Sequence, residues 1–205
     1  MEETAVQAAV QITWWQIAAF ALGSGFVSAL MAKGVQYVAW RSSRKARATR
    51  DALQIAVRLE RFATRAAALI MFNDSLVQML GPHGAHQHFD KDAPLMEDFP
   101  ESIAWIDIDA TLRARAMGLS VEHEMLVQRL RFTLLYACHD GITSQDARHK
   151  TLGYHAFRCL QLAKDLRAAY GIPALNVLGE EESVENTLRS EYQAVLDQRA
   201  KEADA

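Results

Sequence analysis

The chain contains little cysteine and little proline. Cys138 and Cys159 are the only two cysteines among 205 residues, too few for a disulfide framework, and we expect both to be buried small side chains in a reducing compartment. Three of the four prolines lie within residues 81–101, so strong helix breakers are scarce elsewhere. No segment alternates apolar and polar residues with β-branched enrichment, so no strand is predicted. The sequence therefore predicts an all-α protein.

Recognisable catalytic motifs are also missing. The sequence contains no phosphate-binding glycine loop, no nucleophile elbow and no paired metal motif on a helix. The net charge of −3 is unevenly distributed: residues 41–65 include eight basic and two acidic residues, and the chain beyond them is acidic. An acidic body gives no reason to expect a nucleic-acid partner. No cofactor is predicted either.

Residues 12–32 carry no charge. As a helix they would extend about 31 Å, close to the ~30 Å thickness of the hydrocarbon core of a bilayer. Two tryptophans follow the start of this run, and Tyr37 and Trp40 follow its end, where interfacial aromatic residues lie. The acidic start argues against a cleaved signal peptide, although an alanine-rich buried helix of a soluble domain stays an alternative. We predict a transmembrane helix, with its interfacial flank, over residues 12–40.

A basic segment follows directly, at residues 41–50. Because residues 1–11 contain no lysine or arginine, the positive-inside tendency predicts an N-terminus outside and a cytoplasmic C-terminal body. The basic side chains are expected to contact anionic lipid headgroups, each contributing about 1 kcal/mol. Nucleic-acid binding is the alternative for such a cluster. The predicted membrane-surface residues are Arg41, Arg44, Lys45, Arg47 and Arg50.

Small residues recur within the predicted span. Ala21, Gly25 and Ser28 are spaced by four and three and therefore share one helix face, which would let two membrane helices approach closely. Small residues are also simply common in membrane helices. The pattern predicts a homo-oligomer formed through the membrane helix.

The body, residues 51–173, reads as an antiparallel bundle of about three main helices. The first covers residues 50–80, with an apolar stripe that includes Leu53, Ala56 and Val57, and ends at the Gly-Pro-His-Gly sequence that opens a loop at 81–101. A short helix is expected from Asp109, as N-cap, to Gly118. A second main helix begins at residue 120 and ends at Gly141.

The third main helix is predicted from residue 144 to 170. Its apolar positions alternate in steps of four and three, the spacing of a bundle seam, and Gly-Ile-Pro at 171–173 ends it. These positions are Leu152, Ala156, Cys159, Ala163, Leu166 and Tyr170. Residues 174–205 form an acidic segment with a thin apolar face, for which we expect a partly helical, solvated or frayed tail.

Two weak chemical patterns occur in the body. The loop contains His83, His86, His88 and Asp90, which could ligate a transition metal, although solvated loop histidines are the simpler interpretation. Arg148 and His155 match the loose Arg-x(4–6)-His pattern of the all-helical nucleotide-binding ribonuclease family. So many arginines and histidines produce such a match by chance, and we expect His155 to be a helix-flank residue beside the core.

The order of segments resembles a group of uncharacterised bacterial membrane-anchored proteins. The resemblance rests on the apolar run, "DALQIAVRLERFA" at 51–63, "WIDID" at 105–109 and "AKDLRAAYGIP" at 163–173, and it extends over most of residues 12–173. It implies the same architecture and a location in the bacterial inner membrane. It implies no chemistry and no functional residue.

These patterns together predict a single-pass, membrane-anchored helical interaction or scaffold protein that is not an enzyme. Its expected partners are the bilayer, a second copy of the chain and a protein whose identity the sequence does not indicate. The alternative is a metal-binding protein, or a hydrolase or ribonuclease-like enzyme, that uses the histidine-rich loop or the helix of Arg148 and His155.

Overall fold

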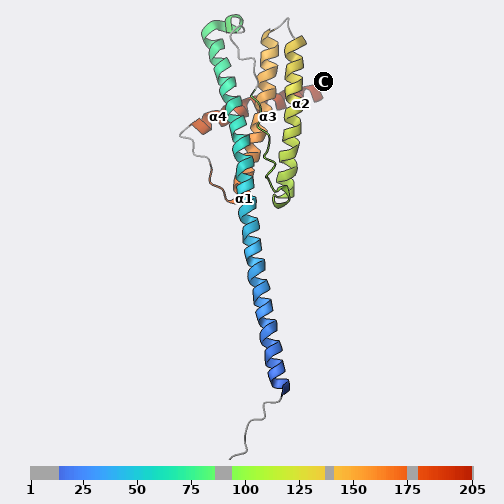
Figure 1. Ribbon diagram of the computed structural model, residues 1–205. Helices are drawn as coiled ribbons and strands as arrows, with labels where there is room; N and C mark the ends of the chain where they lie inside the picture. Colours follow the sequence, from blue (N-terminus) through green and yellow to red (C-terminus); the bar gives the residue numbers. More distant parts are fainter. Residues whose placement is uncertain (1–13, 86–93, 137–140, 175–179, 205) are drawn as a thin grey trace, which may run out of the picture. The chain divides into compact units, whose positions relative to one another are not determined.

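The computed structural model describes residues 14–85, 94–136, 141–174 and 180–204 (Figure 1). Side chains are described for these residues except 14–27, 29, 82–85, 130–136, 141–146, 180 and 181. The elements are helices α1 (Trp14–Ala85), α2 (Ala110–Tyr136), α3 (Gly141–Tyr170) and α4 (Glu180–Ala203), with a 3-10 turn η1 (Trp105–Asp107). The described residues contain no strand, so the predicted all-α class is confirmed. The chain divides into two units, Met1–Ala46 and Arg47–Ala205.

Among the residues searched, no helix is both long and apolar enough to cross a membrane. The predicted span at 12–32 falls largely outside the residues whose side chains are described, since residues 12 and 13 are not described and residues 14–27 and 29 are described as backbone only.

The core of the second unit is built on one face of α1. Ala52, Ile55, Leu59, Phe62 and Ile70 are fully buried there, and alanines fill the positions between them. Small side chains at these positions leave room for the apolar side chains of α2 and α3 that complete the core.

The α1 stripe differs in part from the expected one. Leu53 is exposed and Val57 is half-buried, because the buried face centres on Ala52 and Ala56 rather than on their neighbours. The expected end of the helix is confirmed at Gly81, whose φ of 72° breaks the helical geometry near the last turn. A positive φ costs glycine little.

Helix α2 is one continuous helix, so the predicted stop at Gly118 and restart at residue 120 were wrong. The predicted cap is confirmed, since Oδ1 of Asp109 accepts hydrogen bonds from the amides of Thr111 (2.9 Å) and Leu112 (3.1 Å). A glycine inside a helix costs only about 1 kcal/mol, which the burial of Ala116 and Leu119 on either side of Gly118 outweighs.

Helix α3 confirms the regular stripe. Its predicted seam is buried except for Tyr170, which is half-buried. The helix begins at Gly141, three residues before the predicted start. It ends in a Schellman motif: the amide of Ile172 donates to the carbonyl of Arg167 (2.8 Å), and Gly171 adopts a φ of 62°.

The acidic C-terminal segment is more ordered than expected. Helix α4 covers Glu180–Ala203 and packs on α3, with Leu188 fully buried and the ring of Tyr192 stacked on that of Tyr154 (5.0 Å between centroids). The approach is close at Gly153, where an added Cβ would lie 2.3 Å from Cβ of Glu191. A glycine in α3 therefore makes room for α4, which local sequence periodicity does not reveal.

Candidate functional sites

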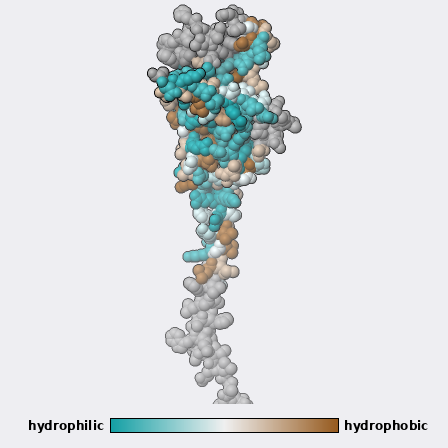
Figure 2. Space-filling model, turned by 180° about the vertical axis from the view of Figure 1, so that it is seen from behind, coloured by the Kyte–Doolittle hydropathy of each residue, from teal (hydrophilic) through white to brown (hydrophobic). Residues whose placement is uncertain are grey.

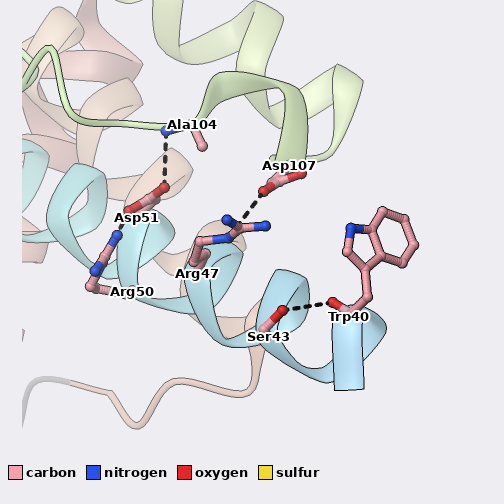
Figure 3. A network of polar contacts seen from close by, with 7 residues as sticks. All are labelled: Trp40, Ser43, Arg47, Arg50, Asp51, Ala104 and Asp107. Atoms are coloured by element: carbon pink, nitrogen blue, oxygen red, sulfur yellow. Dashed lines mark hydrogen bonds and ion pairs between the residues drawn. The ribbon is translucent and has the colours of Figure 1, made fainter. Parts of the chain in front are cut away.

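The segment between α1 and α2 is fixed to α1 by a polar network (Figure 3). The buried carboxylate of Asp51 accepts a hydrogen bond from the amide of Ala104 (3.0 Å) and also meets Nε of Arg50 (3.4 Å). One turn earlier on α1, Nε of Arg47 lies 3.9 Å from Asp107. The "WIDID" sequence thus has a structural role: it carries one carboxylate that the basic segment binds and one that caps α2.

The five predicted membrane-surface residues therefore fall into two groups. Arg47 and Arg50 belong to the second unit and pair with Asp107 and Asp51 (Figure 3). The first group is Arg41, Arg44 and Lys45, in the first unit, where the guanidinium of Arg44 lies 5.5 Å above the ring of Trp40. Arg41 and Lys45 are exposed.

Just before this basic segment, α1 exposes large apolar side chains. Six of them are at least half exposed, an unusual density for a helix in water. Figure 2 shows hydrophobic residues, in brown, on the described part of this unit. Tyr37 and Trp40 pack against each other, with ring centroids 6.1 Å apart. The six residues are Leu30, Met31, Val35, Tyr37, Val38 and Trp40.

A second candidate site is a pair of buried histidines. His123 of α2 and His155 of α3 are stacked, with ring centroids 5.4 Å apart, and the ring of Phe62 from α1 lies steeply inclined to both. Nε2 of His123 accepts a hydrogen bond from the amide of Met96 (3.0 Å). Within the described residues, Nδ1 of His123 and Nε2 of His155 have no hydrogen-bond partner.

The electrostatics of this pair keep both rings neutral. The pKa of His155 is lowered from 6.5 to about 3, mainly by burial and also by the nearby His123 and Arg158. Burial also lowers the pKa of His123, with a partial offset from Glu124. One turn beyond His155, burial raises the pKa of the Cys159 thiol to about 12, so this thiol is inert at neutral pH. A histidine with such a low pKa is a poor general acid at pH 7.

The structure does not present the Arg-x(4–6)-His pattern to solvent. Arg148 and His155 are both buried, and His155 is a core residue rather than the helix-flank residue expected. The neighbouring His149 contacts Asn73 (Nε2 to Nδ2, 3.2 Å) and lies 3.7 Å from Asp74 of α1. These contacts hold α1 and α3 together.

A buried ion pair lies further along the same α1–α3 interface. The guanidinium of Arg167 donates to both oxygens of Glu60, from Nε at 2.5 Å and from Nη2 at 2.8 Å, and its Nη1 donates to the carbonyl of Pro173. Bidentate geometry of this kind satisfies both charges away from water. The pair holds together α1, α3 and the residues that follow the C-terminal cap of α3.

The predicted metal ligands His83, His86, His88 and Asp90 have side chains outside the described residues. The same holds for the side chain of Ala21, and Gly25 lies where only the backbone is described, whereas Ser28 is exposed. Within the part of the chain that was searched, no three histidine, cysteine, aspartate or glutamate side chains are grouped so that they could hold a metal ion.

Comparison of the chain with protein-family models, curated proteins and solved structures finds no match.

Sequence reasoning missed the histidine pair and the Glu60–Arg167 pair. Each joins residues between 32 and 107 positions apart, and a pattern in a single sequence does not show such pairing. The available signal was charge within an apolar stripe: Glu60 and Arg167 each follow a buried leucine directly, at Leu59 and Leu166.

Proposed function

We propose that the protein is a membrane-tethered helical interaction or scaffold protein, held in the membrane by α1 and presenting its second unit in the cytoplasm. The supporting observation is the order of features along α1 in the first unit. Six exposed apolar side chains end in Tyr37 and Trp40, and the cations Arg41, Arg44 and Lys45 follow immediately. This is the order expected where a helix leaves the hydrocarbon, passes the aromatic interface and meets anionic headgroups.

The buried polar residues support a scaffold better than an enzyme. The two stacked histidines are neutral and shielded from solvent, and the Cys159 thiol is unreactive. Each of these groups lies at a contact between helices, where it specifies how the bundle packs.

The orientation can be tested with C-terminal reporter fusions in bacteria. A periplasm-dependent phosphatase fused after Ala205 should be inactive on the full chain, because positive charge beside the span retains that side in the cytoplasm. Replacing Arg41, Arg44 and Lys45 together by glutamine should raise phosphatase activity severalfold. If the unmodified chain has the same phosphatase activity as the triple variant, the proposed orientation is wrong.

A matched control removes the same charge from the second unit. Replacing Arg61, Arg65 and Arg189 by glutamine breaks ion pairs with Glu97 and Glu185 in which the arginine side chain is exposed, and should leave the orientation unchanged. A rise equal to that of the first triple variant would mean that overall charge, rather than its position, sets the topology.

Self-association through the membrane helix is part of the same proposal. Gly25→Ile should lower the signal of a membrane two-hybrid assay about tenfold, because a branched side chain holds the two backbones apart on the face of Ala21 and Ser28. Leu30→Ile alters a large residue instead of a small one and serves as the control. Equal signals from wild type and Gly25→Ile would remove the small-residue face as the cause.

A further inference from the structure

Helix α2 is apolar on two sides. Its inner side contributes Leu112, Ala116 and Leu119 to the core. On its outer side Met117, Val121 and Met125 are 43%, 59% and 68% exposed. These three recur every four residues and share one face, where a helix of a water-soluble bundle normally carries polar side chains.

Two small residues share this outer face. Ala114 and Gly118 are exposed, and a Cβ added to Gly118 would meet no atom of the described residues within 4 Å. Glycine at an exposed helix position is less stable than alanine, and no other described residue fills the space over it. We refer to Ala114, Met117, Gly118, Val121 and Met125 as the α2 outer face.

Charge along α2 indicates what covers this face. Its first turns carry Arg113 and Arg115, its middle turns carry Glu122 and Glu124, and its later turns carry Arg129 and Arg131. A second α2 in parallel would set like charges against each other, whereas an antiparallel α2 sets the basic turns against the acidic ones.

Size complementarity supports the same arrangement. With a two-fold axis midway between Gly118 and Val121, Gly118 faces Val121 of the second copy, and Ala114 faces its Met125. Each small residue then receives a large one, as close packing requires.

The flanking charges are already positioned for such a contact. On one flank of the outer face, Arg115 bonds to Asp165 of α3 (2.7 Å), and Glu122 accepts from both terminal nitrogens of Arg158. An antiparallel two-fold contact brings Arg115 of each copy beside Glu122 of the other. The Arg115–Asp165 and Glu122–Arg158 pairs of the two copies then join into networks of alternating charge at the rim of the contact.

We propose that the α2 outer face is a homodimer contact, formed by antiparallel packing of α2 from two copies of this chain. The occupant is thus a second copy of the chain. One helix face is a small interface, so the contact is weak in dilute solution and is favoured when chains are concentrated. It does not depend on membrane anchoring and is separate from the small-residue face of α1.

Cysteine cross-linking of the full chain distinguishes the orientations. Ala114→Cys and Met125→Cys are introduced into differently tagged copies that carry Cys138→Ser; the buried Cys159, with its pKa raised to about 12, does not interfere. A short bismaleimide should cross-link the mixed copies about tenfold more than either variant with itself. Met79→Cys, also on an exposed apolar residue, should not cross-link.

Other outcomes overturn the proposal. Preferential 114–114 and 125–125 cross-links would show a parallel contact, and yields equal to those of Met79→Cys would show random collision. Absence of any cross-link would refute the homodimer contact.

A second variant tests the packing directly. Val121→Glu changes an exposed residue, so the helical circular dichroism should be kept while the 114–125 cross-link falls about tenfold. A fold kept with undiminished cross-linking would also refute the contact. Both assays are run in detergent and in membranes. Failure of the membrane anchor would change only the fraction in which the chain is found, so it can be told apart from failure of the α2 contact.

Discussion

Glu60→Ala should lower the free energy of unfolding by about 3–5 kcal/mol. The substitution leaves the guanidinium of Arg167 buried without the carboxylate that accepts two of its hydrogen bonds. Breaking one partner of a buried pair costs more than the pair itself contributes, because the remaining charge cannot return to water. Urea denaturation of the full chain in detergent, followed by circular dichroism, measures the loss.

The control is an ion pair with the same bidentate chemistry at the surface. Glu122 also accepts from two nitrogens of one arginine, Arg158, but both side chains are about 40% exposed. Glu122→Ala should therefore cost under about 1 kcal/mol. The double variant Glu60→Met with Arg167→Met should cost less than Glu60→Ala, since it leaves no buried charge. Equal losses from the two single variants would show that Glu60 is accessible to water.

The second large effect is a loss of stability in acid that depends on His155. Its pKa is lowered from 6.5 to about 3 in the folded chain, so below pH 6.5 the unfolded chain binds a proton that the folded chain excludes. The contribution of this histidine is complete above pH 6.5 and is lost as the pH falls towards 3. The slope it adds is about 1.4 kcal/mol per pH unit.

His155→Phe should flatten this dependence between pH 6.5 and 5. Phenylalanine keeps a ring against Phe62 but binds no proton. The pKa of His123 is also lowered, so His123 keeps part of the pH dependence of stability in the variant. The pKa of the Glu185 carboxylate is lowered by Lys164, so Glu185 adds a loss of stability only in more acidic solution. A slope that His155→Phe leaves unchanged would exclude His155 as its source.

The periodic parts of the fold were predictable, and the contacts that override periodicity were not. The α3 seam from Leu152 to Leu166 repeats over several turns, and one face of a helix must then be buried. Gly118 predicted the end of a helix, but the burial of apolar side chains on either side of it keeps α2 continuous. The sequence of α4 looked too polar for a helix that packs on the bundle. Its packing depends on space that Gly153 leaves on α3, and the sequence of α4 alone does not show that space.

The basic segment shows the same limit at the candidate site. The sequence places five cations after the apolar run, and composition alone treats them alike. The structure separates Arg47 and Arg50, which pair with Asp107 and Asp51, from the cations of the first unit. Asp107 is 60 positions from Arg47, and no local pattern predicts that contact. Only Arg41, Arg44 and Lys45 are therefore assigned to headgroups in the proposal.

Membrane fractionation of the full chain and of a chain without residues 1–40 tests the central claim most directly. The full chain should remain in the membrane pellet after high-salt and alkaline washes, because an apolar helix is not released by either. The shortened chain keeps the whole of the unit Arg47–Ala205, and should appear in the supernatant with a cooperative melting transition. Recovery of the full chain in the supernatant, or retention of the folded shortened chain in the washed pellet, would contradict anchoring by the first forty residues.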